Sequence, residues 1–290
     1  MEKQHILFIV NPISGGRKGR FRPEYVEKYL DHSRFTYKIY ETRRAGDGYR
    51  KVLKKLDKYD GFVAVGGDGT VNEVFTAIVN SNKWFSVIPN GSGNGLARSL
   101  KIPMDIPGAI RHLNQAAVEN IDYALINGEP FINVAGVGFD AMIASKFKKS
   151  TSRGFKSYAE ITLNELKKMK SHKVKIAIDK KKITKRVVLV SFANSSQFGN
   201  NAHIAPNAKL NDGKLRIVTF KPFHWISLPY LAWLMFNKSI DKSKLHREYV
   251  IQKATITSKK KIHLHIDGEA RGKVKKIDLE VVSGGIRVMA

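Results

Sequence analysis

The sequence contains no cysteine, few acidic residues and no long apolar run. The lack of cysteine excludes disulfides and cysteine-based zinc sites, and it fits a reducing compartment. Lys and Arg number 51 against 25 Asp and Glu, so the formal charge of +26 favours nucleotides, acidic membrane surfaces or nucleic acid as partners. No stretch approaches the roughly 18 apolar residues of a bilayer-spanning helix. Because a strand begins at Ile6, leaving no room for a signal peptide, we expect a cytoplasmic protein.

What the sequence does contain is enough apolar residues for two packed domains. It has 290 residues, of which 42% are hydrophobic and 26% charged, as in globular proteins. Up to about residue 122, strand and helix patterns alternate, which predicts an α/β domain with a doubly wound parallel sheet. From 123 to 290, short β-branched runs predict a mostly antiparallel β domain, interrupted by helices near 154–169 and 223–237.

The stretch 62–79 organises the first domain. A buried strand at 62–65 leads through three glycines into a helix with apolar residues at Val71, Val74, Phe75 and Ile78. Such a turn aims backbone N–H groups and the positive helix end at one spot, and glycines allow φ > 0 and close approach of an anion. Asp68 in this turn predicts a bound metal ion or a proton acceptor. The alternative is an ordinary sharp strand–helix connection.

Two more strands end in loops rich in glycine and asparagine, at 11–16 and 90–95. In a parallel sheet the carboxyl ends of strands lie at one edge, where ligands bind. Three phosphate-compatible loops at that edge are hard to explain as plain turns. The first loop is not a Walker A loop, because Gly19 follows Lys18. A dinucleotide fingerprint at Gly136, Gly138 and Ala141, with Glu160 about twenty residues on, is a weak signal without a second βαβ unit.

The motifs together resemble the diacylglycerol kinase catalytic domain family, which includes bacterial diacylglycerol kinases, sphingosine kinases and ceramide kinases. The motifs that carry the resemblance are GGDGT at 66–70, NPISG at 11–15, PNGSGNGLAR at 89–98, NVAGVGFDA at 133–141, NDGKL at 211–215 and IDGE at 266–269. Asp122 also stands where the family has an aspartate. GGDGT alone is shared with NAD kinases. The resemblance covers nearly the whole chain and implies an NAD-kinase-like α/β domain at 1–122 that binds nucleotide and a β-rich lipid-substrate domain at 123–290.

The resemblance implies ATP and Mg²⁺ as cofactors, because phosphoryl transfer needs a phosphate cradle, a metal ion and a carboxylate. The implied nucleotide contacts are Asn11, Pro12, Ser14, Gly15, Arg17, Thr42, Gly66, Gly67, Asp68, Gly69, Thr70, Asn72, Glu73 and Ser92. Two departures from the family pattern matter. Gly16 replaces a common lysine, so Arg17 or Lys18 would contact phosphate, and Gly95 replaces the aspartate usual in bacterial diacylglycerol kinases.

Three carboxylates are catalytic candidates by resemblance. The family assigns the proton acceptor either to the GGDG aspartate, here Asp68, or to the acid of the later motif, here Glu269, with Asp267 as helper or metal ligand. Asp267 and Glu269 flank a glycine and can point the same way, although Asp-Gly also marks hairpin turns. The resemblance further implies a structural Mg²⁺ at Asp212, with the carbonyl groups of Lys209 and Lys214 as ligands.

The expected function is ATP-dependent phosphorylation of a primary hydroxyl on a diacylglycerol-like or sphingoid lipid, as in phospholipid biosynthesis. An NAD kinase is the alternative enzyme, and a basic nucleic-acid-binding protein is the alternative of another class. No nucleic-acid-binding motif supports the latter, so we expect no nucleic acid partner. Peripheral contact with an anionic membrane is expected from the charge and from Trp225, Tyr230 and Trp233, although an aromatic helix at 223–237 also suits a core. A homodimer is compatible with the sequence.

Overall fold

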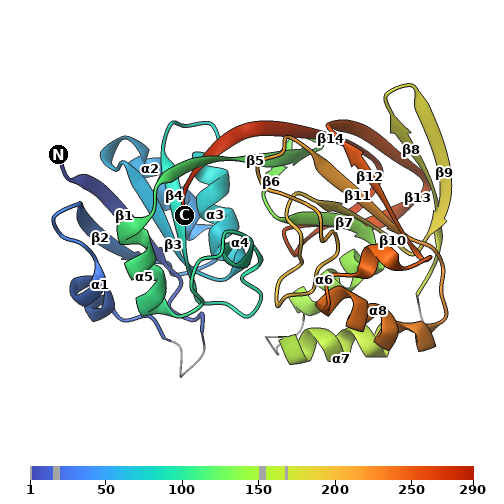
Figure 1. Cartoon of the computed structure of the whole chain (residues 1–290), viewed down its shortest axis with the longest axis horizontal. Coiled ribbons are helices and arrows are strands. Elements are labelled where there is room, and N and C mark those ends of the chain that lie inside the picture. Colours follow the sequence, from blue (N-terminus) through green and yellow to red (C-terminus); the bar gives the residue numbers. More distant parts are fainter. Residues whose placement is uncertain (1, 16–19, 150–154, 167–168) are drawn as a thin grey trace. The chain divides into compact units, whose positions relative to one another are not determined.

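The computed structural model describes residues 2–15, 20–149, 155–166 and 169–290 (Figure 1). The chain forms two compact units. Unit 1 runs to Ile121 and regains Gly284–Ala290, and unit 2 is Asp122–Ser283. The sequence analysis placed 123–290 in one domain, whereas the last residues lie in unit 1. The reason is that the final strand is long enough to leave unit 2 and pair again, in parallel, with a strand of the first sheet.

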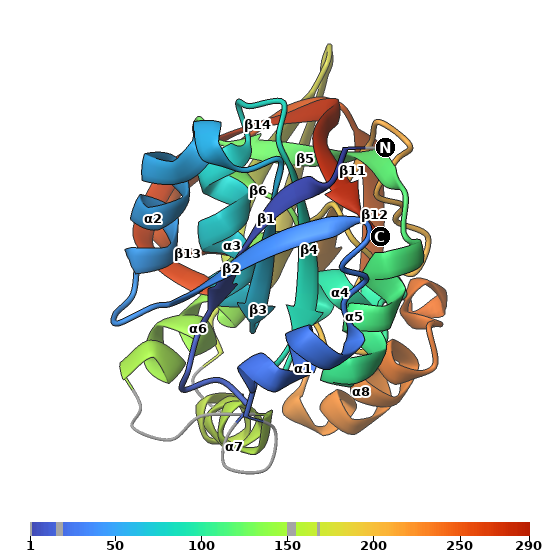
Figure 2. The same ribbon diagram turned by 90° about the vertical axis from the view of Figure 1, so that its left-hand side faces the viewer.

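Unit 1 is built on a parallel sheet in the order β4-β3-β1-β2. Its strands are β1 Gln4–Val10, β2 Phe35–Glu41, β3 Gly61–Gly66 and β4 Trp84–Pro89. All residues of β3 and β4 are buried, which matches their continuous apolar runs. Helices cover the sheet (Figure 2): α1 Pro23–Tyr29, α2 Asp47–Lys55, η1 Leu56–Lys58, α3 Asp68–Ile78, α4 Gly95–Ser99 and α5 Ile106–Gln115. The doubly wound arrangement brings the loops after the four strands to one edge.

Unit 2 is mostly antiparallel. Its main sheet has the order β12-β11-β10-β7-β13-β14, and β8 pairs with both β13 and β9. The strands are β5 Val118–Ile126, β6 Glu129–Phe131, β7 Val134–Gly138, β8 His172–Ile178, β9 Lys181–Val187, β10 Leu189–Ala193, β11 Leu215–Phe220, β12 His246–Ile251, β13 Lys253–Ile266 and β14 Glu269–Met289. The predicted fold class, an α/β domain followed by a mostly antiparallel β domain, is confirmed.

The helical segments of unit 2 are α6 Phe139–Lys149, α7 Phe155–Glu165, η3 Trp225–Ser227, α8 Leu228–Phe236 and η4 Ile240–Lys242. α6 is not among the helices that the sequence predicts, which lie near 154–169 and 223–237. Gly138 enters this helix with φ +109°, and a Cβ there would lie 2.5 Å from the Val188 carbonyl oxygen. The strand therefore turns into α6 at a position that only glycine fits.

The long strand β13 is continuous from Lys253 to Ile266, with a shift of its pairing to β14 between Thr257 and Ile262. Lys259, Lys260 and Lys261 form this irregular stretch and are exposed. A bulge at this point lets the strand keep three consecutive lysines in water. In the part of the chain that the structure describes, no helix is both long and apolar enough to span a bilayer.

Candidate functional site

The N-terminus of α3 differs from those of its neighbours in unit 1. Carboxylates accept hydrogen bonds from the first backbone amides of α2, α4 and α5, and they come from Glu73, Asp68 and Asp105 respectively. The residue before α3 is Gly67, which has no side chain to act as an acceptor. The positive end of α3 follows the fully buried strand β3, at the loop edge of the sheet. Among the described residues, the first amides of α3 have no carboxylate acceptor, unlike those of α2, α4 and α5, so this helix end suits an anion supplied from outside. α1 also lacks a side-chain cap.

Asp68 begins α3 and holds the neighbouring loop. Its Oδ1 accepts from the Gly95 N–H at 2.8 Å, and its Oδ2 accepts from the Asn94 N–H at 3.1 Å. Asp68 therefore caps α4 from another segment, and both loops become parts of one structure. A carboxylate oxygen is the type of ligand that Mg²⁺ prefers. Gly95, which departs from the bacterial pattern, is here the residue whose amide fixes Asp68.

The glycines of the 66–70 turn are needed for space rather than for φ. Gly67 has φ −92°, which any residue adopts, so the expectation of φ > 0 is wrong at this position. A Cβ on Gly67 would lie 3.2 Å from the Gly91 Cα, and a Cβ on Gly91 would lie 2.4 Å from the Gly67 Cα. The two backbones pass in direct contact. A Cβ on Gly66 would meet the Thr70 hydroxyl at 2.4 Å, so Thr70 closes the turn from inside.

Asn90 links the first loop to the third. Its N–H donates to the Gly66 carbonyl at 2.8 Å, and its Nδ2 donates to the Ser14 Oγ at 3.2 Å. Ser14 in turn donates through Oγ to the Asn11 carbonyl at 2.7 Å, and the Asn11 N–H donates to Val65 at 3.0 Å. Sequence reasoning missed Asn90, although its place directly after β4 was a usable signal. The loops after β1, β3 and β4 are thus joined by hydrogen bonds without any ligand.

The remaining predicted nucleotide contacts fall into three groups. Glu73 uses both carboxylate oxygens on the amides of Gly46 and Gly48, at 2.7 and 2.9 Å, so it holds the loop after β2. The Thr42 hydroxyl donates to the Val10 carbonyl at 3.2 Å, which places it beside the first loop. Pro12, Gly15, Gly69, Asn72 and Ser92 lie in or next to these loops, partly or fully exposed. Arg17, with Gly16 and Lys18, lies outside the described residues.

Asp267 in unit 2 lies in a tight hairpin turn, which was the alternative for this motif. Asp267 and Gly268 have φ +46° and +82°, and Ile266 pairs with Glu269, as in a two-residue type I′ hairpin. The Asp267 carboxylate accepts from the amides of Ile132, Asn133 and Val134 at 2.9 to 3.1 Å, and the residue is buried. The interpretation that Asp267 and Glu269 point the same way from a strand end is therefore wrong.

Glu269 faces outward from the same hairpin. Its side chain is 45% exposed, and its Oε2 lies 3.5 Å from Nη1 of Arg271, which also pairs with Glu129 at 2.6 Å. A weak, partly exposed ion pair leaves this carboxylate able to reach a substrate group. Of the two acids in the IDGE motif, only Glu269 has the access that a proton acceptor needs.

A buried polar cluster lies next to this hairpin and was missed as a cluster. Asp140, in the first turn of α6, accepts through Oδ2 from the Ser191 hydroxyl and pairs with His265 Nε2, each at 3.2 Å. Gly136 makes room, because a Cβ there would lie 2.6 Å from Asp140 Oδ2. His265 lies near the end of β13, two residues before Asp267. The cluster therefore connects α6 to the end of β13 that carries the hairpin.

The residues around Asp212 do not fit the predicted structural Mg²⁺. The Asp212 Oδ2 lies 2.5 Å from Nη2 of Arg216, and the Lys214 N–H donates to Oδ1 at 3.1 Å. The buried guanidinium of Arg216 also lies 3.4 Å from the Asn207 carbonyl and 3.4 Å from Glu248. Arg216 thus supplies a positive charge to the Asp212 carboxylate, where the prediction placed a metal ion. Burial raises the pKa of Glu248, and the charge of Arg216 opposes this rise.

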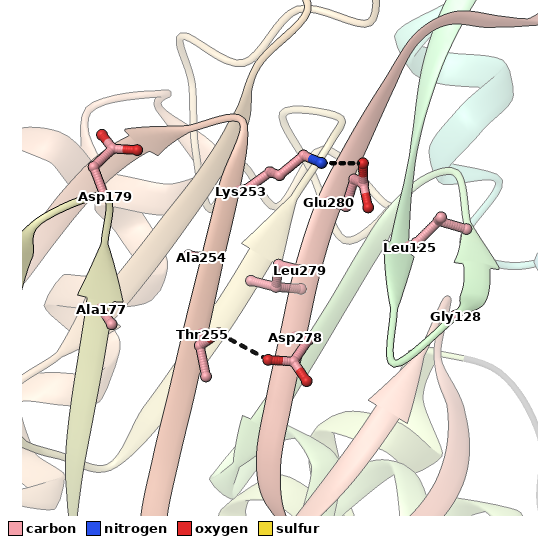
Figure 3. Close-up of a pocket in the computed structure, with 10 residues that line it drawn as sticks. All are labelled: Leu125, Gly128, Ala177, Asp179, Lys253, Ala254, Thr255, Asp278, Leu279 and Glu280. Atoms are coloured by element: carbon pink, nitrogen blue, oxygen red, sulfur yellow. Dashed lines mark hydrogen bonds and ion pairs between the residues drawn. The ribbon is translucent and has the colours of Figure 1, made fainter.

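The hollow in Figure 3 is not this site. It has a volume of about 460 Å³ and is lined by strands β5, β8, β13 and β14 of unit 2. The Lys253–Glu280 ion pair of 2.6 Å and the Thr255–Asp278 hydrogen bond of 2.8 Å lie along its side. Asp278 is nine residues from Glu269 along β14, which at about 3.3 Å a residue amounts to about 30 Å. No predicted site residue lines the hollow.

Comparisons with known proteins agree with this arrangement. The family model described as diacylglycerol kinase catalytic domain matches residues 5–126, and the YegS C-terminal NAD kinase beta sandwich-like domain matches residues 133–290. The chain belongs to the diacylglycerol kinase family. Its membership in this family of lipid kinases confirms the resemblance and the prediction that the chain is an enzyme of that class.

Several relatives of this diacylglycerol kinase family member align over most of their length. A protein named diacylglycerol kinase from Staphylococcus saprophyticus is 27% identical and covers 94% of this chain and 91% of its own. One with the same name from Staphylococcus aureus is 28% identical over 94% and 88%. The crystal structure of a diacylglycerol kinase from Bacillus anthracis covers 100% of this chain and 97% of its own, with a TM-score of 0.79 and 22% identity, and shows the shared fold.

Proposed function

We propose that this chain transfers the γ-phosphoryl group of ATP to a primary hydroxyl of a lipid of the diacylglycerol or sphingoid kind. The observation that carries the proposal is the set of loops around the N-terminus of α3. Asn90, Asp68 and Glu73 tie these loops together, and the helix end between them has no side-chain cap. Because the cradle is held by the chain's own hydrogen bonds, it is preorganised for a polyphosphate.

Unit 1 is the nucleotide-binding domain in this proposal. The backbone of Gly67–Thr70 receives the phosphates, with Asn11, Ser14, Gly15 and Ser92 along the loops on either side. Asp68 is the side chain that fits a Mg²⁺ ion, because its carboxylate lies in the first turn of α3, beside the anion site. The ion would neutralise charge on the phosphates during transfer. Asp68 itself keeps the loops together in either case.

Unit 2 is the lipid-substrate domain and supplies the proton acceptor. We assign that role to Glu269 rather than Asp267, since three amides hold the buried Asp267 carboxylate while Glu269 is partly exposed. The Asp267 hairpin positions Glu269. Asp68 is the other acceptor candidate, and it is less accessible because amides of Asn94 and Gly95 occupy both oxygens. A lipid acceptor dissolved in a bilayer requires peripheral contact with the membrane surface, and the charge of +26 favours anionic lipids.

The test is a transfer experiment with a defined readout. The purified protein is incubated with γ-labelled ATP and Mg²⁺, together with a cell lipid extract, diacylglycerol, a sphingoid base or NAD. Label in a lipid product supports the proposal and names the lipid. Label in NAD would identify a soluble-substrate kinase of the NAD kinase kind and would contradict the lipid assignment, as would transfer to none of the four.

A further inference from the structure

Five large apolar side chains are exposed together on one short segment of unit 2. Trp225 and Ile226 belong to η3, and Tyr230, Trp233 and Phe236 belong to α8, with exposed fractions from 46% to 65%. We call these five residues the aromatic face. Tyr230 and Trp233 stack with ring centroids 6.3 Å apart and an angle of 18° between planes. These two rings therefore pack against each other at the surface.

The opposite side of α8 anchors the helix. Leu231 and Leu234 are buried in a cluster with residues of β7, β10 and β11, including Val134, Ala193 and Val218. Tyr230 and Trp233 alternate with these leucines at helical spacing, so the helix has two apolar sides of which one is covered. Residues 223–237 therefore belong to the core on one side of the helix and to the surface on the other. The aromatic face can be changed without emptying the core.

The concentration of exposed apolar residues is unusual for the chain. Ten large apolar side chains are exposed among the described residues, and five of them fall within 225–236. Of the other five, Tyr49 and Leu53 both lie on α2, whereas Ile13, Leu163 and Val250 lie in a loop, on α7 and on β12. Single exposed apolar residues need no explanation, but a contiguous patch marks an interaction surface.

The charges around the aromatic face indicate what covers it. Exposed Lys221, Lys238, Lys242 and Lys244 flank the segment, and Asp241 is the single acid between Lys221 and Lys244. A second copy docked through the same face would bring these lysines toward their equivalents, which like-charge repulsion disfavours. An anionic surface with an apolar layer beneath it complements both the lysines and the rings. Tryptophan and tyrosine prefer the interfacial layer of a bilayer.

We propose that the aromatic face is a membrane-docking surface that lies in the interfacial layer of an anionic lipid bilayer. The nine residues of α8 rise about 13 Å, far short of the roughly 30 Å of a hydrocarbon core, so the helix lies along the surface. The lysines contact the headgroups while the five apolar side chains enter the headgroup–acyl boundary. The inference rests on the proposed lipid substrate for its purpose, but its evidence is independent of the kinase site.

Intrinsic fluorescence gives a direct readout, since the protein has three tryptophans. Trp84 is buried in unit 1, whereas Trp225 and Trp233 are exposed. Vesicles of phosphatidylcholine with about one third phosphatidylglycerol should shift the emission to the blue, and brominated acyl chains should quench it. Binding should weaken in high salt without disappearing, and neutral vesicles should bind much less. Emission unchanged by anionic vesicles at low salt would overturn the proposal.

Paired substitutions locate the surface. The double variant Trp225→Ser with Trp233→Ser should keep the wild-type melting temperature, because both side chains are exposed, and should lose vesicle affinity by about tenfold or more, as cosedimentation measures. Val250→Ser, at an exposed apolar position on β12 of the same unit, is the matched control and should bind like wild type. The double variant Lys238→Gln with Lys242→Gln should bind vesicles more weakly than wild type at low salt. At high salt its binding should equal that of wild type. Wild-type affinity in the tryptophan variant would overturn the proposal.

Two further measurements separate this inference from the kinase function and from dimerisation. Transfer to a lipid in detergent micelles should be equal in the tryptophan variant and wild type, with a deficit only on vesicles. If the wild type binds vesicles through this face but phosphorylates no lipid in either format, the proposed function fails and the docking surface stands. If sedimentation shows that the wild type is a dimer, and the tryptophan variant a monomer with unchanged vesicle binding, the face is a subunit contact and the proposal is wrong.

Discussion

Asp68 and Asp267 offer a comparison between the two units, since each precedes a glycine and follows a buried strand. In unit 1, Asp68 begins a helix and joins two loops, with one backbone amide on each oxygen. In unit 2, Asp267 closes a hairpin and is buried under three amides. The same pair of residues therefore joins two loops in one unit and closes a hairpin in the other. The difference lies in the turn that follows and in the burial of the carboxylate, which is greater for Asp267.

The same comparison extends to the groups that would bind substrate. Unit 1 presents mostly backbone amides and the end of α3, which bind phosphate without depending on many side chains. In the IDGE hairpin of unit 2, Glu269 is the accessible acid and the buried Asp267 fixes the turn. Substitutions should therefore affect chemistry and stability differently in the two units, and the variants below are chosen to separate these effects.

The largest expected effect is on turnover. Asp68→Asn should lower the rate of phosphoryl transfer by about 10²–10⁴-fold, because a neutral amide neither holds a metal ion well nor accepts a proton. The fold should survive, since the remaining oxygen still accepts a hydrogen bond. Asp105→Asn is the matched control, because Asp105 also caps a helix but lies outside the loops. Near-wild-type transfer by Asp68→Asn would show that Asp68 only supports the loops, as Asp267 does.

The next effect is on the stability of unit 2. Arg216→Gln should lower the free energy of unfolding by about 3–5 kcal/mol, because it leaves the partly buried acids Asp212 and Glu248 without their cation. A chelator should leave the wild-type melting temperature unchanged, since the guanidinium and not a metal ion holds the loop. Thermal melting with and without chelator checks both points. A drop of several degrees in the wild type would restore the predicted Mg²⁺ site.

A smaller loss is expected at the hairpin. Asp267→Ala leaves three backbone amides without their acceptor and should cost about 2–3 kcal/mol. Glu269→Gln, two residues away, should change stability by less than about 0.5 kcal/mol, because the side chain is partly exposed. Denaturant titration of both variants gives the comparison. Equal losses would contradict the division between a scaffold acid and an accessible acid.

The smallest effect concerns the contact between the loops of unit 1. Gly91→Ala places a Cβ 2.4 Å from Gly67 and should weaken ATP binding more than Gly67→Ala, whose Cβ lies at 3.2 Å from Gly91. Gly67→Ala should lower the melting temperature only slightly, since its φ suits alanine. ATP titration by calorimetry measures both affinities. If both variants bind ATP like the wild type, the triphosphate does not lie in this turn.

The fold of unit 1 and its site loops could be predicted because each motif is contiguous. Strand, glycine turn and helix stand next to each other at 62–79, and their order fixes the loop edge. The contacts of Asp68 and Glu73 could not be predicted, because their partners are 24 or more residues away in sequence. In unit 2, IDGE was found as a motif, but the amides that hold Asp267 come from 132–134. The return of β14 to β4 and the pairing of Arg216 with Asp212 and Glu248 also depend on tertiary register.

One measurement tests the central claim, that unit 1 binds ATP and Glu269 accepts the proton from a lipid hydroxyl. Transfer from γ-labelled ATP to the lipid acceptor is compared between wild type and Glu269→Gln, with ATP affinity measured on the same preparations. The account predicts transfer to lipid by the wild type and a loss of about 10²–10⁴-fold in the variant at unchanged ATP affinity. Wild-type turnover in Glu269→Gln, or no transfer to lipid by the wild type, would contradict it.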